Sequence, residues 1–205
     1  MKRLTTAAAL GALALAASMA SAAPMTFDID KGHTDVGFSI RHFFSKVPGT
    51  FKEFNGIIVY DDKDVAASSV NVTIQTASIF TNNEKRDAHL RGAEFFAADS
   101  LPTITFKSTG VAPADKDRFK VTGDLTMHGV TKPVVLDAQF LGMGQVGVGG
   151  QAWGTKAGFE ATTTVNRKDF GISWNKTLDQ GGLMLGDDVE IVLRVEANLQ
   201  TRPQK

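Results

Sequence analysis

The densest group of chemically versatile side chains in this sequence is Arg86, Asp87 and His89. A guanidinium, a carboxylate and an imidazole at this spacing could hold an anionic head group, or could act as general acid and base on a bound substrate. A capped helix with solvated charges is the simpler interpretation, and we favour it at this stage. A second polar pair, Arg167 and Asp169, is interpreted in the same way, as a structural pair at a bend.

The remaining histidines give no metal-binding pattern. His33, His42 and His128 stand apart from one another and from His89, with no pair at the spacing of metal ligands, and the sequence has no cysteine. There is no G-x-S-x-G motif, and the glycine run at 147–150 is not followed by the Lys-Ser/Thr of a phosphate loop. The sequence therefore predicts no catalytic residue, no metal and no cofactor.

A helix must carry the Arg86 group, and the segment 78–96 is where one is predicted. Thr81 and Glu84 have the spacing of a capping box, and Gly92 stands where a left-handed terminal residue would end the helix. Phe95 and Phe96 follow directly. One short helix that ends in two phenylalanines suggests a lid on a closed sheet, with a surface crossover helix as the alternative.

Outside this helix the sequence alternates between apolar and polar residues, which predicts strands with one apolar face. Turn signals are Pro48-Gly49 and the pair Gly129 and Pro133, and Gly56 indicates a bulge or a bend. The glycine-rich segment 142–154 is either a loop or a bent strand. The predicted strands are nine, near 27–30, 35–41, 51–60, 70–75, 104–106, 119–127, 134–140, 159–165 and 189–199.

This pattern predicts an all-β fold, either a sandwich or an antiparallel barrel of about eight strands with the helix covering one end. A barrel of that size can hold one small ligand. The aromatic residues are 14 Phe, 2 Trp and 1 Tyr. Phenylalanine brings apolar area without a polar group, so this bias suits a dry cavity or a packed core equally.

The first 22 residues have the composition of a signal peptide. Lys2 and Arg3 precede the apolar segment 4–20, and Ala20-Ser21-Ala22 forms a cleavage signal. A retained membrane anchor is the weaker alternative. We expect one domain over 23–205 in the bacterial periplasm, although secretion fits as well. Without Lys2 and Arg3, 20 basic residues face 22 acidic ones, so neither nucleic acid nor an anionic surface is an expected partner.

The chain resembles the YceI-like family of exported polyisoprenoid-binding proteins. The resemblance implies a lipocalin-like antiparallel barrel around an elongated apolar pocket, and a long isoprenoid ligand such as a polyprenyl pyrophosphate or a quinone. It implies no catalytic residue. The matching segments are HTDVGFSIRH (33–42), GTFKEFNG (49–56), TNNEKRDAHLRGAEFF (81–96), LPTITF (101–106), GDLTMHGVTKPV (123–134) and NRKDFGISW (166–174).

Strand parity and aromatic character then suggest which residues meet such a ligand. Arg86 and His89 would contact the head group. An enzyme acting on a lipid or amide through Arg86, Asp87 and His89 is the alternative, as is an interaction module for a membrane redox protein. The oligomeric state stays open, a homodimer included. The residues expected to line the tail are Phe38, Ile40, Phe51, Phe54, Phe96, Phe106, Phe140 and Trp174.

Overall fold

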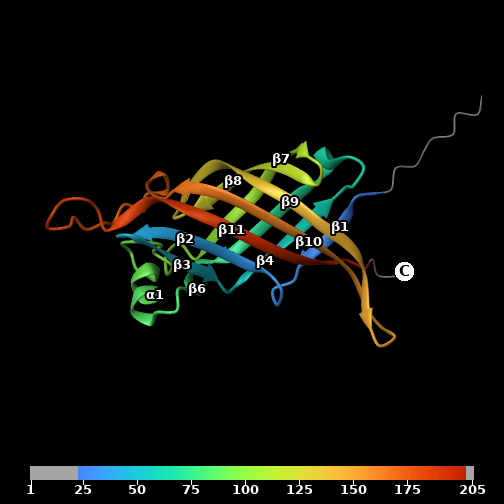
Figure 1. The fold of residues 1–205 in the computed structure, drawn as a ribbon, viewed down its shortest axis with the longest axis horizontal. Helices are drawn as coiled ribbons and strands as arrows, with labels where there is room; N and C mark the ends of the chain where they lie inside the picture. Colours follow the sequence, from blue (N-terminus) through green and yellow to red (C-terminus); the bar gives the residue numbers. More distant parts are fainter. Residues whose placement is uncertain (1–22, 202–205) are drawn as a thin grey trace, which may run out of the picture.

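A computed structural model describes residues 23–201, so the predicted signal peptide lies outside the described residues. One twisted antiparallel sheet makes up most of the molecule (Figure 1). A helix, α1 (Glu84–Arg91), and the short 3-10 turns η1 (Val65–Ala67), η2 (Thr76–Ser78) and η3 (Arg167–Phe170) join its strands. The strands are β1 (Met25–Ile29), β2 (Asp35–His42), β3 (Ser45–Phe51), β4 (Phe54–Tyr60), β5 (Ser69–Gln75), β6 (Ile79–Phe80), β7 (Thr103–Asp115), β8 (Arg118–Met127), β9 (Val130–Val148), β10 (Gln151–Asn166) and β11 (Leu185–Leu199).

The sheet closes on itself and forms a barrel. Eight strands follow one another in the order β1-β4-β5-β7-β8-β9-β10-β11, and β1 pairs back onto β11 with Phe27 opposite Leu199. Inward residues alternate with outward ones most clearly along β8, where Phe119, Val121 and Leu125 are buried, and register shifts interrupt this period in β7, β10 and β11. The predicted all-β antiparallel barrel of about eight strands with one short helix is therefore confirmed.

The last strand of the barrel, β11, has two successive partners along its length. β11 pairs with β1 near its C-terminal end and with β2 over the rest, where Leu193 lies opposite Val36. β3 and β6 extend the sheet beyond β2. The helix α1 contacts β6 and lies at the end of the barrel where β2 turns into β3. We call this the α1 end (Figure 1).

The turn predicted at Pro48-Gly49 is wrong because both residues lie inside a strand. Pro48 and Gly49 belong to β3, and the chain turns instead at Phe43-Phe44. Pro48 is tolerated because β3 pairs with β6 only at Thr50 and Phe51, which leaves the edge beside Pro48 unpaired.

A bulge at Gly56, one of the two alternatives there, is wrong, and so is the connection predicted to end at Pro133. Gly56 sits in regular register opposite Val72, and an added Cβ would lie 2.7 Å from the Ile29 side chain. Close packing, not a bulge, therefore requires glycine here. Gly129 does turn the chain with φ of +74°, but Pro133 already pairs with Asp124 inside β9.

The glycine-rich segment is a hairpin. β9 and β10 pair as far as Val148 opposite Gln151, and Gly149 and Gly150 form the turn with φ of +62° and +83°. Register shifts near Gly158 bend the ribbon, which projects at the end opposite α1 (Figure 1). We call this the hairpin end. Of the two interpretations of the segment, the bent strand is the correct one.

The helix caps differ from those predicted. The N-cap is Asn83, whose side chain accepts the Arg86 N–H, and Gly92 has φ of −70° and is not left-handed. Thr81 does not cap the helix because it is buried and its hydroxyl is bonded to the Asp87 carboxylate. A side chain on the helix therefore fixes the loop before it.

Candidate functional site

The barrel encloses a cavity of about 570 Å³. This volume lies within the range of roughly 300–1,000 Å³ that is usual for small-molecule sites. Its wall is almost entirely apolar and is built by inward residues of the strands, together with residues of α1 and of the segments after it. The interior of this barrel is therefore not a filled core.

The positions of two phenylalanine rings explain why the cavity stays open. Phe38 lies opposite Gly49 on the neighbouring strand, and a Cβ added to Gly49 would stand 2.3 Å from the tip of the Phe38 ring. Phe106 covers Gly123 in the same way, at 2.4 Å. Each ring lies flat over a glycine in the barrel wall. The rings thus present an apolar surface to the cavity without occupying its middle.

An aromatic cluster closes the barrel toward the hairpin end. Tyr60 stacks on Phe140 with ring centroids 4.8 Å apart, and Phe159 and Phe119 lie 5.7 and 6.3 Å from Tyr60. Burial raises the pKa of the Tyr60 hydroxyl, with nearby carboxylates adding to the effect, so this plug carries no charge near neutral pH. Phe140 belongs to this plug, not to the cavity lining.

The α1 end of the cavity has an aromatic rim. The rings of His89 and Trp174 are perpendicular with centroids 5.0 Å apart, and Phe95 lies 4.9 Å from His89 and 5.1 Å from Trp174. Phe95 lines the cavity and is buried, although the sequence prediction named only its neighbour Phe96. Adjacent phenylalanines outside a periodic segment give no signal that separates their two environments.

Arg86 places a positive charge at the same end. Its Nε–H donates to the Thr81 hydroxyl at 2.6 Å, and its Nη2 donates to the Thr81 carbonyl at 2.7 Å. Asp87 accepts the Thr81 N–H at 2.9 Å from the other side. Nη1 of Arg86 has no hydrogen-bond partner within residues 23–201. The guanidinium is therefore held rigidly against the cavity while one of its nitrogens stays available.

The three polar residues of this segment do not form an acid–base group. Asp87 is 5% exposed, and its Oδ1 accepts both hydrogen bonds from Thr81. The Nε2 atom of His89 lies 2.8 Å from a carboxylate oxygen of Glu94. Across residues 23–201, Asp87 and His89 share no hydrogen bond. The geometry supports an anchored cation, not proton transfer between these residues.

Arg167 holds the rim in place through backbone contacts that the sequence did not reveal. Its guanidinium is almost fully buried and donates to the carbonyl oxygens of Gly186, Ile172 and Trp174 at 2.9, 2.8 and 2.8 Å. Its acidic partner is Asp187 at 3.3 Å, so the predicted pairing with Asp169 is wrong. Burial lowers the pKa of Arg167, and the Asp187 carboxylate opposes this shift.

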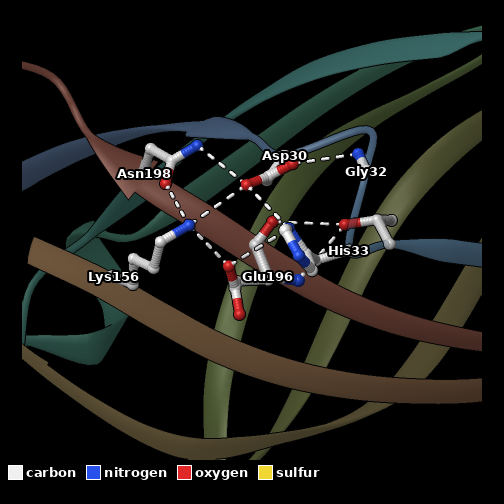
Figure 2. Close-up of polar contacts among 7 residues, drawn as sticks. Asp30, Gly32, His33, Lys156, Glu196 and Asn198 are labelled. Atoms are coloured by element: carbon white, nitrogen blue, oxygen red, sulfur yellow. Dashed lines mark hydrogen bonds and ion pairs between the residues drawn. The ribbon is translucent and has the colours of Figure 1, made fainter. Parts of the chain in front are cut away.

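A cluster of polar side chains on the barrel wall links the turn between β1 and β2 to the strands β10 and β11 (Figure 2). Asp30, His33 and Glu196 lie close enough together to hold a metal ion. The Lys156 ammonium bonds to both carboxylates, at 3.1 Å from Asp30 and 2.6 Å from Glu196, and to the Asn198 side-chain oxygen at 2.9 Å. A lysine in this position supplies the balancing charge, so the cluster is a structural ion-pair network.

The structure thus brings most of the predicted ligand-binding residues to one cavity. Only Phe140 lies elsewhere, in the aromatic plug, although its inward orientation follows the predicted parity. Of the ten predicted residues, those on the cavity wall are Phe38, Ile40, Phe51, Phe54, Arg86, His89, Phe96, Phe106 and Trp174.

Comparisons with known proteins give a consistent assignment. The model of the YceI-like domain family matches residues 27–197. A UPF0312 protein of Azotobacter vinelandii is 40% identical over 197 residues, which cover 96% of this chain and 97% of that protein. Protein YceI of Escherichia coli O157:H7 is 41% identical over 198 residues, with 96% and 97% covered. Within residues 23–201, no helix has the length and apolar character needed to cross a membrane.

Solved structures share the fold. The YCEI protein of Campylobacter jejuni is 35% identical and superposes with a TM-score of 0.64 over 84% of this chain and 96% of that one. BcnA of Burkholderia cenocepacia has a TM-score of 0.71 at 24% identity, over 83% and 99% of the two chains. A polyisoprenoid binding domain from Saccharophagus degradans has a TM-score of 0.60 at 13% identity, over 86% and 99%. Together with the matched domain and the 40% identical relatives, this fold shows that the chain belongs to the YceI-like domain family.

Proposed function

We propose that this protein binds one long-chain isoprenoid lipid inside the barrel and sequesters, stores or carries it in the periplasm. The observation that carries the proposal is the apolar cavity of about 570 Å³ with one anchored guanidinium at its α1 end. The tail would lie along the cavity between Phe38 and Phe106. The head group, a pyrophosphate or a quinone ring, would face Arg86 and His89.

The tail and the head group of the lipid contribute differently to the free energy of binding. Burying one CH₂ group contributes about 0.8 kcal/mol relative to water, so a long tail would nominally exceed the limit of about 18–21 kcal/mol on real affinities. The relevant reference is a membrane, whose interior is as apolar as leucine. Transfer of the tail is then nearly neutral, and the contact with Arg86 decides which lipids the protein extracts.

One of the structures that share the fold supports this proposal by the ligand class in its description. The Saccharophagus degradans domain, which shares the fold, is described as polyisoprenoid binding. Its low identity transfers no residue contacts to this chain, so the cavity itself remains the main support.

The direct experiment is mass spectrometry of the lipid extract that co-purifies with the mature protein from its native envelope. We expect an isoprenoid at a ratio near one per chain. Phe106→Asp should abolish this retention, because it places a carboxylate on the cavity wall, while circular dichroism still shows the barrel. Val135→Asp is the matched control, since Val135 is exposed on the outer face. An empty wild-type protein, or full retention by folded Phe106→Asp, would refute the proposal.

A second variant tests the head-group contact. Arg86→Gln should weaken binding of a prenyl pyrophosphate by about tenfold or more, because a hydrogen bond to a charged group contributes about 1.5–3 kcal/mol. Binding of the matching prenyl alcohol should change much less. Equal losses for both ligands would show that Arg86 acts only through its hydrogen bonds to Thr81.

A further inference from the structure

The loops around the cavity at the α1 end expose an apolar tip. Phe44 is fully exposed, and Phe43 and Leu183 are 36% and 41% exposed. The Phe43 N–H donates to the Met184 carbonyl at 2.9 Å, so the β2–β3 turn and the loop 175–184 are joined at this point. We call Phe43, Phe44 and Leu183 the rim tip.

The rim tip is continuous with the cavity wall. His42, immediately before it, and Met184 and Leu185, immediately after it, all line the cavity. Leu185 also pairs with His42 across the β2–β11 ladder. The rim tip therefore directly adjoins residues that line the cavity.

The turn is built to hold these side chains outward. Phe43 has φ of +50°, a left-handed conformation that bulky residues rarely adopt. Arg41 Nη1 donates to the Phe43 carbonyl at 3.1 Å, and the Ser45 hydroxyl donates to the His42 carbonyl at 3.3 Å. The hydrogen bonds thus fix a costly conformation that exposes two adjacent phenylalanines, and exposed apolar groups of this kind indicate an interaction site.

We infer that the rim tip docks on the surface of a lipid bilayer, so that the lipid passes between membrane and cavity without crossing water. This inference rests on the proposed function, because an isoprenoid resides in a bilayer and the rim tip adjoins the cavity that would receive it. Phenylalanine and leucine on protruding loops insert at the boundary between head groups and acyl chains.

Basic side chains also lie beside the rim tip. Lys46 is paired with Glu190 and Lys168 with Asp187, whereas Arg41 and Lys176 form no ion pair within residues 23–201. These two cations add attraction to anionic head groups to the apolar contact. Docking should therefore weaken in part, but not disappear, when salt is raised or anionic lipid is removed.

The hairpin end supplies a matched control. Val148 and Trp153 are 64% and 56% exposed, at least as much as Phe43 and Leu183. They belong to the β9–β10 hairpin, which lies at the end of the barrel opposite α1 (Figure 1). If exposed apolar area alone caused membrane binding, this hairpin would bind as well as the rim tip.

The test is co-sedimentation of the mature protein with vesicles of phosphatidylethanolamine and phosphatidylglycerol. We expect wild type to bind, Phe44→Ser to lose about tenfold or more in partitioning, given the area of one phenylalanine, and Val148→Ser/Trp153→Ser to bind as wild type. No binding by wild type, no effect of Phe44→Ser, or loss in the hairpin variant would overturn the inference. Binding only to native envelope vesicles would also overturn it, in favour of a membrane protein as the partner.

A parallel measurement separates this inference from the proposed function. Farnesol, delivered from solution and followed by tryptophan fluorescence, tests the cavity without a membrane. Phe44→Ser should bind farnesol as wild type does, which would confirm that the rim tip acts in transfer alone. Weaker farnesol binding in Phe44→Ser would contradict a docking role. Absence of farnesol binding in wild type, with vesicle binding intact, would refute the cavity assignment and leave the docking surface standing.

Discussion

The role of Arg167 can be tested by a substitution that keeps its bulk. Arg167→Met removes the hydrogen bonds to three carbonyl oxygens and the ion pair with Asp187. Each buried carbonyl left without a donor costs about 1–3 kcal/mol, and Gly186 and Ile172 are both buried. Breaking a buried charge network from one side typically costs about 3–5 kcal/mol. We expect a loss of this size in the free energy of unfolding.

Urea unfolding and thermal unfolding measure this loss. In a chain of this length, 1 kcal/mol shifts the Tm by roughly 2–4 °C, so Arg167→Met should unfold roughly 6–20 °C below wild type. In a Trp153→Phe background Trp174 is the remaining tryptophan, and its emission should shift to the red because its carbonyl is no longer held. Lipid retention should fall with the displaced rim.

Lys168→Met is the matched control because Lys168 bonds to the same carboxylate, Asp187, from the surface. Its side chain is 42% exposed, and exposed ion pairs contribute about 0–1 kcal/mol. Equal losses in the two variants would refute the reasoning, since the buried carbonyl contacts would then contribute nothing beyond the ion pair.

Three further predictions concern other parts of the barrel. Gly49→Ala should push the Phe38 ring into the cavity, cost about 1–3 kcal/mol and reduce lipid retention, whereas Gly110→Ala, which meets open space, should do neither; equal thermal unfolding of both variants would contradict the ring–glycine packing. Asp87→Asn should lower stability by about 1–3 kcal/mol in urea unfolding because a neutral amide oxygen accepts the two buried hydrogen bonds from Thr81 more weakly than a carboxylate does, with the exposed Glu84→Gln as the control that should lose little. Burial raises the pKa of Asp30, but hydrogen bonds from His33, Lys156 and Asn198 outweigh it and hold the pKa well below its ordinary value of 3.8. The charged carboxylate therefore stabilises the fold above about pH 3.8 and loses this contribution as the pH falls, so Asp30→Asn should show a shallower decline in unfolding free energy between about pH 4 and pH 2 than wild type; an unchanged slope would contradict this assignment.

Much of the barrel could be predicted because strand alternation is a local signal. Residues two apart share a face whatever their partners are, so the inward positions of Phe38, Phe106 and Phe140 follow from the sequence. Local turn and cap signals failed where a distant partner competed with them. A strand tolerates Pro48 because the adjoining edge is unpaired. Thr81 does not cap the helix because its hydroxyl donates a hydrogen bond to the Asp87 carboxylate.

The sequence by itself thus determined most of the strands, their apolar faces, the presence of one helix and the group of residues that could meet an apolar ligand, although it merged the end of β3 with β4 and missed β6. The tertiary structure alone decided whether those faces fill the barrel or line a space within it. Phe38 and Phe140 have the same parity, yet one lies over Gly49 beside the cavity and the other stacks on Tyr60 in the plug. The physical reason is that a cavity depends on how side chains from several strands meet across the barrel, and residue spacing within one strand contains no information on that distance.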